Sequence, residues 1–126
     1  MKMPTHLKYT PSHEWIAVEP DGTMKIGITD FAQQQLGDIV FLELPKVGAH
    51  YAVSAVCGVI ESVKAVSDLY MPLAGSVLAI NDDVAKKPEQ VNTDPYGAWM
   101  FRFKPDHAAD AGTLLDAAAY EREAHE

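Results

Sequence analysis

Short β-prone segments alternate with turn-forming residues along most of this 126-residue chain. Residues 14–19 form the first segment, Pro20-Asp21-Gly22 a turn, and residues 23–28 alternate apolar and polar side chains as a half-buried strand does. These two segments predict a hairpin. Further strands are expected at residues 39–44 (buried throughout), 53–63, 66–70, 77–80 and 99–104, the last with Trp99, Phe101 and Phe103 on one face. Six or more short strands predict a mainly β fold, a sandwich or a barrel.

Two helices are expected beside these strands. The segment FAQQQL, residues 31–36, follows two residues able to cap a helix and precedes Gly37, which predicts a two-turn helix. Thr113 and Asp116 have the spacing of a capping box, which predicts a C-terminal helix from residue 114. Residues 81–92 are polar and contain a proline, so a loop is expected there.

Composition and charge limit the classes of function. With 48 % apolar and 22 % charged residues, the chain is expected to form one globular domain over residues 1–126. Ten basic against eighteen acidic side chains give a net charge of −8, which argues against binding to nucleic acid or to an anionic membrane. Residues 1–10 lack the apolar core of a signal peptide, and no apolar run is long enough to span a bilayer. We expect a monomer in a reducing bacterial cytoplasm, with partners that offer positive patches.

The sequence lacks recognisable motifs for catalysis, redox chemistry or metal binding by the chain itself. Cys57 is the single cysteine, which excludes an internal disulfide, a CxxC redox pair and a cysteine-based zinc cage, and it is expected to be a small buried hydrophobe. The five histidines lack the spacing of a metal chelate, and most of them are expected at the surface. Gly58 and Gly75 are expected either where two backbones approach closely or in a special turn conformation. The chain is therefore expected to bind or carry something.

Lys64 lies where two β-prone segments meet, in Val63-Lys64-Ala65. If the segments pair as a hairpin, the lysine is at its tip, where a modifying enzyme can reach it. Acylation of the amine would remove the charge and lengthen the side chain. A solvated surface lysine is the ordinary alternative, and spacing alone favours that alternative.

Longer motifs favour a modified Lys64 over a solvated surface lysine. The segment ESVKAVSDLYMPLAGSV at residues 61–77 resembles the attachment site of a lipoyl-carrying domain, and in particular that of glycine cleavage system H proteins. Four other segments resemble the same family in the same order: PSHEW at 11–15, IGITDFAQQQLGDIVFLELPKVG at 26–48, VNTDPYG at 91–97 and LLDAAAYE at 114–121. The resemblance implies a flattened barrel–sandwich hybrid whose modified lysine lies on a hairpin turn.

The resemblance also implies a function. It makes the chain a non-catalytic carrier with lipoic acid covalently attached to Lys64, which shuttles the aminomethyl group of glycine. Its expected partners are a pyridoxal-phosphate glycine decarboxylase (P protein), a folate-dependent aminomethyltransferase (T protein), a flavin dihydrolipoyl dehydrogenase (L protein), and a lipoate ligase or a lipoyl or octanoyl transferase. Because one cysteine cannot form an internal disulfide, the redox pair must come from such a cofactor.

The resemblance also implies roles for specific side chains. Ser12, Glu14 and Asp68 are expected to line a cleft that holds the cationic aminomethyl end of the arm away from water. The alternatives are a turn residue for Ser12, a solvated strand end for Glu14 and a surface charge on the hairpin for Asp68. A surface read by the ligase or by partner enzymes is expected at Glu61, Ser62, Val63 and Ala65. Two segments depart from the family pattern. The link Gly97-Ala98-Trp99 is one residue shorter, and residues 107–113 look less helical than the family's. Both departures bear on contacts with partner proteins.

Four alternatives stay open. The chain could be a biotinyl carrier or an oxo-acid dehydrogenase lipoyl domain, although biotin sites flank their lysine with methionines and Val63 and Ala65 flank it here. It could be a lipoylated protein that hands lipoate on to other proteins or serves a different lipoate-dependent pathway. It could be a binding module with an unmodified lysine. It could be an enzyme built on Ser12-His13 or on Cys57, which would turn over substrate without partner proteins.

Overall fold

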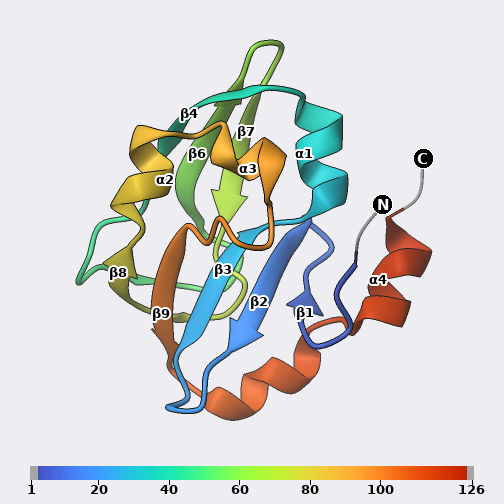
Figure 1. The fold of residues 1–126 in the computed structure, drawn as a ribbon. Helices are drawn as coiled ribbons and strands as arrows, with labels where there is room; N and C mark the ends of the chain where they lie inside the picture. Colours follow the sequence, from blue (N-terminus) through green and yellow to red (C-terminus); the bar gives the residue numbers. More distant parts are fainter. Residues whose placement is uncertain (1–2, 125–126) are drawn as a thin grey trace.

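The computed structural model describes residues 3–124 and contains two antiparallel β-sheets, which do not close into a barrel (Figure 1). The larger sheet has the order β1 (Lys8–Tyr9), β2 (Glu14–Val18), β3 (Met24–Ile28), β9 (Phe101–Pro105), β8 (Gly75–Ile80), β5 (His50–Tyr51). The smaller sheet has the order β4 (Ile39–Glu43), β6 (Val56–Ser62), β7 (Val66–Tyr70). The predicted mainly β fold class is confirmed.

Within residues 3–124, four short α-helices and one 3₁₀-helix connect and flank the sheets. They are α1 (Asp30–Leu36), α2 (Asp82–Lys86), α3 (Gln90–Thr93), the 3₁₀-helix η1 (Ala108–Thr113) and α4 (Ala117–Glu123). The predicted internal helix is confirmed as α1: the Thr29 hydroxyl accepts from the Ala32 amide, and Gly37 ends the helix with φ +79°. In residues 3–124 no helix has the length and apolar character needed to cross a membrane.

The predicted hairpin is confirmed as β2–β3. The two strands pair in register from Glu14 opposite Ile28 to Val18 opposite Met24. Gly22 takes φ +87° in the turn, a conformation that glycine adopts without steric cost. The Asp21 carboxylate accepts from the backbone amide and the hydroxyl of Thr23 (2.9 and 2.6 Å), which closes the turn.

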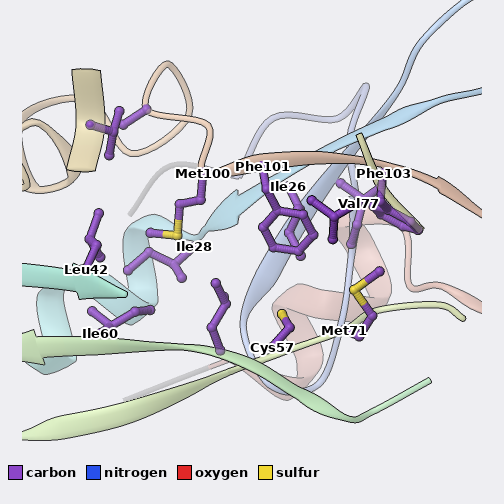
Figure 2. Close-up of a cluster of buried hydrophobic side chains, with 14 of the residues drawn as sticks. Ile26, Ile28, Leu42, Cys57, Ile60, Met71, Val77, Met100, Phe101 and Phe103 are labelled. Carbon is purple, nitrogen blue, oxygen red and sulfur yellow. The ribbon is translucent and has the colours of Figure 1, made fainter. Parts of the chain in front are cut away.

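The main hydrophobic core lies between the two sheets (Figure 2). Both sheets and the loops between them contribute side chains to it, and burial of this apolar area is the main favourable term in folding. Cys57 belongs to this core with 7 % of its surface exposed, as predicted for a small buried hydrophobe. The other labelled members are Ile26, Ile28, Leu42, Ile60, Met71, Val77, Met100, Phe101 and Phe103.

Gly58 and Gly75 lie where neighbouring strands approach closely, which is the first of the two settings expected for them. A Cβ atom on Gly58 would overlap the carbonyl oxygen of Glu43 on the adjacent strand β4. A Cβ atom on Gly75 would overlap the carbonyl oxygen of Lys104 on β9. In both places the backbone oxygen cannot move without disturbing its strand, so only glycine fits.

The prediction that residues 39–44 are buried throughout is wrong. Only Ile39 and Leu42 are buried in β4, whereas Val40 and Phe41 are 54 % and 50 % exposed. The pairing with β6 shifts between Ile39 and Phe41, which is the mark of a β-bulge. A bulge adds one residue to a strand, so that two successive apolar side chains both lie outside the core here.

The loop predicted for residues 81–92 is also wrong, because α2 and α3 form there. Val84 and Val91 are buried and anchor one helix each in the core. Asn92 then connects this region to α1: its side-chain amide donates to the Gly37 carbonyl (2.9 Å), and its side-chain oxygen accepts from the Ile39 amide (2.8 Å). These contacts are long-range and leave no local pattern in the sequence.

The C-terminal helix begins three residues later than predicted. Asp116 caps α4 by accepting from the Ala119 amide (2.8 Å), while the Thr113 hydroxyl donates to the Asp110 carbonyl. Between them, Leu115 forms a β-bridge with Tyr9, exchanging two backbone hydrogen bonds of 2.8 Å. The extended backbone that this bridge requires excludes a helix that starts at residue 114.

Two strands begin later than predicted. Residues 53–55 are not extended, because Ser54 turns the chain with φ +67°, and β6 starts at Val56. Strand β9 starts at Phe101, so the predicted aromatic face is limited to Phe101 and Phe103. Trp99 packs outside the main core, with the Lys25 amine 5.4 Å from its ring centre.

Candidate functional site

The β6–β7 hairpin extends beyond the rest of the molecule, and Lys64 lies in its turn (Figure 1). Across the turn, the Ser62 amide donates to the Ala65 carbonyl (2.8 Å). The Ser62 hydroxyl oxygen accepts from the amides of Lys64 and Ala65 (3.3 and 3.0 Å). The Val63 amide donates to the Asp38 carbonyl (3.0 Å), which connects the turn to the residue before β4. The backbone of the turn is therefore held in place while the Lys64 side chain is exposed.

The surroundings of Lys64 fit covalent attachment of a long acyl group. Its side chain is exposed, and among residues 3–124 no carboxylate lies within ion-pair distance of its amine. A Cβ atom on Gly37 would lie 3.6 Å from the Lys64 Cε atom, an ordinary van der Waals distance, so the lysine stem passes close to the end of α1. An attached group would have open space around the turn and would meet no competing partner for the nitrogen.

A cleft of about 300 Å³ lies between α1, the start of β2 and strand β7. Ser12, Glu14 and Asp68, the three side chains expected there, all line it although 54 residues separate Glu14 from Asp68. Apolar and polar side chains both contribute to the rest of the lining. The apolar ones are Ile28, Phe31, Ala32, Leu36 and Ile60, and the polar ones are His13, Gln35 and Ser67.

Glu14 is the most unusual group in this cleft, because its side chain is charged in water yet only 2 % of its surface is exposed. The hydroxyls of Ser12 and Thr10 both donate to its Oε1 atom (2.6 and 2.7 Å). Burial raises the pKa of Glu14 to about 7, against the opposing effect of these bonds and of the Tyr70 amide. Near neutral pH the carboxyl group can therefore either carry a proton or face a cation as an anion.

His13 is half-buried, unlike the surface position expected for most of the histidines. It adopts φ +70°, and its Nδ1 atom lies 2.9 Å from the Tyr120 hydroxyl. That hydroxyl also lies 2.7 Å from the Thr29 hydroxyl, which caps α1. Burial lowers the pKa of His13, which favours the neutral ring. The terminal helix α4 thus braces both the start of β2 and the start of α1.

Some cleft residues were missed from the sequence. Gln35 lies four residues after Phe31, so the helical spacing of the predicted segment could have placed the two on one face. His13 gave no such signal, because its partner Tyr120 is 107 residues away. Ser67 follows the alternation of β7, in which it lies opposite the buried Ile60.

The residues expected to be read by a ligase lie at and below the hairpin turn. Val63 is 69 % exposed, Ala65 is exposed and Ser62 organises the turn. Glu61 lies on β6, half-exposed, directly opposite Phe41 on β4 and Val66 on β7. The structure therefore presents these residues on one accessible surface beside Lys64.

Ser12 and Glu14 also line a second cavity, of about 410 Å³. Its walls come from regions that are far apart in the sequence and include the Tyr9 and Tyr70 side chains. No sequence pattern indicates this cavity, because its lining joins β1, the loop before β6, the end of β7 and residues 113–115.

The geometry does not support either of the two nucleophiles considered from the sequence, Ser12 and Cys57. Ser12 directs its hydroxyl to Glu14, and His13 contacts Tyr120, so the two neighbours do not form a nucleophile–base pair. Burial raises the pKa of the Cys57 thiol to about 12, which keeps the thiol protonated. The enzyme alternative on these residues therefore loses its chemical basis.

The comparisons agree with the resemblance seen in the sequence. The family model described as "Glycine cleavage H-protein" matches residues 7–126. Glycine cleavage system H proteins of Azoarcus sp. (strain BH72) and Chromobacterium violaceum are each 56 % identical to this chain, over 121 and 122 residues, covering 96 % of it and 95 % of the relative. A crystal structure of a glycine cleavage system H protein from Mycobacterium marinum has a TM-score of 0.86 at 40 % identity, covering 95 % of this chain and 97 % of that one. The chain belongs to the glycine cleavage H-protein family.

Proposed function

We propose that this member of the glycine cleavage system is a non-catalytic lipoyl carrier, with the lipoyl group attached to Lys64. It carries the aminomethyl group of glycine from the pyridoxal-phosphate decarboxylase to the folate-dependent aminomethyltransferase. The dihydrolipoyl dehydrogenase then reoxidises it. The relatives are bacterial, so we place this system in a bacterial cell.

One observation supports this proposal above the others: an exposed hairpin lysine lies on the same molecule as a cleft that contains a buried carboxyl group. Lys64 is at the turn, and Glu14 lies in the cleft with Ser12 and Asp68. The partly apolar wall can exclude water from an arm that lies in the cleft, and the carboxyl groups can hold its cationic end.

A lipoyl dithiolane on Lys64 would supply a reversible disulfide and the sulfur that accepts the aminomethyl group. The chain itself supplies position and protection. Ser12 and Thr10 orient the Glu14 carboxylate through their hydroxyls. A cation placed against Glu14 would stabilise its anionic form and lower its raised pKa, so binding and deprotonation would favour each other. Asp68 is exposed at the rim and adds a second negative charge.

A substitution at Lys64 tests the proposal. We expect Lys64→Arg to abolish the exchange of glycine carboxyl carbon with bicarbonate that the decarboxylase performs with its carrier, because arginine offers no acylatable amine. Lys87→Arg, at an exposed position after α2, is the matched control and should support exchange at the wild-type rate. Normal exchange with Lys64→Arg would refute the proposal.

A further inference from the structure

Tyr120 is fully buried although it belongs to the short terminal helix α4, which packs beside β1 (Figure 1). Its ring stacks on the Tyr9 ring, with centroids 4.7 Å apart and planes 9° from parallel. Its hydroxyl oxygen lies 2.7 Å from the Thr29 hydroxyl and 2.9 Å from Nδ1 of His13. One hydroxyl group therefore connects α4 to two segments that form the cleft, while Tyr120 itself is not part of the cleft lining.

The bonding capacity of these groups assigns the hydrogens of the network. The buried Thr29 hydroxyl accepts from the Ala32 amide (3.2 Å), so its own hydrogen needs an acceptor, and within residues 3–124 the Tyr120 oxygen is the one in reach. Tyr120 then donates to Nδ1 of a neutral His13 ring. The reverse order would leave the hydrogen of a fully buried hydroxyl without an acceptor, which is costly. The network therefore runs in one direction, from α1 through Tyr120 to His13.

Both ends of the network reach the walls of the cleft. The His13 ring lines the cleft and lies against the Phe31 ring, with centroids 4.7 Å apart. Glu14, the buried acid of the cleft, is the next residue along the chain. Thr29 caps α1, the helix that carries Phe31, and its backbone amide donates to the His13 carbonyl (3.1 Å). The placement of Phe31 relative to Glu14 thus depends on contacts that meet at Tyr120.

The backbone of His13 also needs support from outside its own strand. Its φ of +70° is in the left-handed region, which residues with a side chain seldom adopt. Such conformations persist where surrounding contacts hold them, and they concentrate at binding sites. Within residues 3–124 the Tyr120 hydroxyl is the side-chain group that bonds the His13 ring, and the Thr10 carbonyl accepts from the His13 amide (3.0 Å).

We propose that Tyr120 is a positioning residue of the cleft, and that its hydroxyl holds α1 and the start of β2 at the separation that an aminomethyl-loaded arm requires. The inference rests on the proposed function and adds the terminal helix to the site. Tyr120 acts through His13 and Thr29, not by touching the arm. Walls that are already fixed lose little conformational freedom when the arm enters, so the arm is held more tightly.

The test compares two forms of the full lipoyl-bearing protein, one with the aminomethyl group and one with the free dihydrolipoyl arm. We expect loading to raise the Tm of the wild type, because a group that binds only the folded state stabilises that state. Tyr120→Phe keeps the ring on Tyr9 and removes the hydroxyl. It should lose more than half of that increase and release formaldehyde from the loaded arm about fivefold faster, the ratio expected for one ordinary hydrogen bond.

A control and a second variant separate positioning from general stability. A hydroxyl that only stabilises the fold would lower the Tm of both forms equally and leave their difference unchanged. Tyr51→Phe, at a half-buried tyrosine on β5 outside the cleft lining, should preserve both the difference and the release rate. Thr29→Val removes the other hydroxyl of the network and is also outside the lining. Because both hydroxyls act through one network, the double variant with Tyr120→Phe should release formaldehyde no faster than Thr29→Val alone.

The outcomes distinguish this inference from the proposed function. A wild type whose Tm does not respond to loading would contradict both, because the cleft would then not hold the arm. A wild-type response that Tyr120→Phe retains in full, with an unchanged release rate, would overturn only the positioning role. Additive effects of Tyr120→Phe and Thr29→Val would also overturn it. If Tyr120→Phe does not fold, the Tm difference and release rate of Thr29→Val decide the question in the same way.

Discussion

Glu14 is an ionisable residue of the cleft whose side chain is almost fully buried. Only 2 % of it is exposed, and two hydroxyls donate to one of its oxygens. Burial nevertheless dominates and raises its pKa from the ordinary value of 4.5 to about 7. The site therefore maintains a carboxyl group that is costly to ionise in the empty cleft and that a bound cation would help to ionise.

This shift predicts a pH-dependent stability. Because the folded pKa is above the unfolded one, folding takes up a proton between pH 4.5 and about 7. The contribution of Glu14 to the free energy of unfolding is greatest below that range and falls as pH rises through it. Glu14→Gln keeps an acceptor oxygen and carries no charge, so we expect it to exceed the wild type in stability at pH 8 by up to about 3 kcal/mol, with no difference near pH 4.5.

Urea unfolding of both proteins at several pH values measures this difference. Glu121→Gln, on the exposed surface of α4, serves as the control and should shift stability little at any pH. A Glu14→Gln effect that is constant across pH would show that the carboxyl group does not titrate in this range.

The same residue should protect the carried group. Glu14→Ala removes the buried carboxylate that faces the cationic end of the arm, and a hydrogen bond to a charged group contributes about 1.5–3 kcal/mol. We expect the loaded protein to lose its aminomethyl group to water roughly tenfold faster, measured as released formaldehyde and ammonia. An unchanged half-life would remove Glu14 from the site of protection.

At the scale of elements, the sequence predicted those whose bonds are mostly local. The β2–β3 hairpin has its turn signal at Gly22, and α1 has its cap at Thr29 and its end at Gly37. Each of these was predicted to within about one residue, because the residues that decide the structure are neighbours in the chain.

Elements decided by distant partners were predicted less well. Thr113 and Asp116 have correct capping-box spacing, yet the bridge of Leu115 to Tyr9 delays the helix to Ala117. The α2 and α3 helices depend on burial of two valines within a polar segment. Local propensity is a weak prior, and tertiary contacts override it in such places.

Strand β6, which leads to Lys64, offers a test of packing. Gly58→Ala would place a Cβ atom on the Glu43 carbonyl oxygen, so the β4–β6 pairing must shift. We expect a loss of about 2–4 kcal/mol in the free energy of unfolding, measured with urea. Gly112→Ala is the control, because its Cβ atom would meet nothing within 4 Å. Equal effects of the two substitutions would contradict the close approach.

At the scale of the whole molecule, the cleft is assembled from three separate regions. Glu14 comes from β2, Phe31 from α1 and Asp68 from β7, and Tyr120 of α4 braces the first two from outside. No spacing in the sequence could bring these regions together. The prediction of Ser12, Glu14 and Asp68 as one site depended on the resemblance to a family, while the walls of the cleft required the fold.

The net charge of −8 affects how partner proteins approach this chain. The described ion pairs neutralise few of the acidic groups, so most remain available to attract positive surfaces. A carrier that visits several enzymes benefits from fast, salt-sensitive encounters more than from tight binding. The acidic surface near the hairpin is consistent with that requirement.

Mass spectrometry of the protein purified from its own host tests the central claim most directly. The account predicts a lipoyl group on Lys64, located by fragmentation of the peptide that contains residues 61–77. Material from another host could lack the group, so the native source matters. An unmodified Lys64 in a host that degrades glycine through this protein would contradict the account.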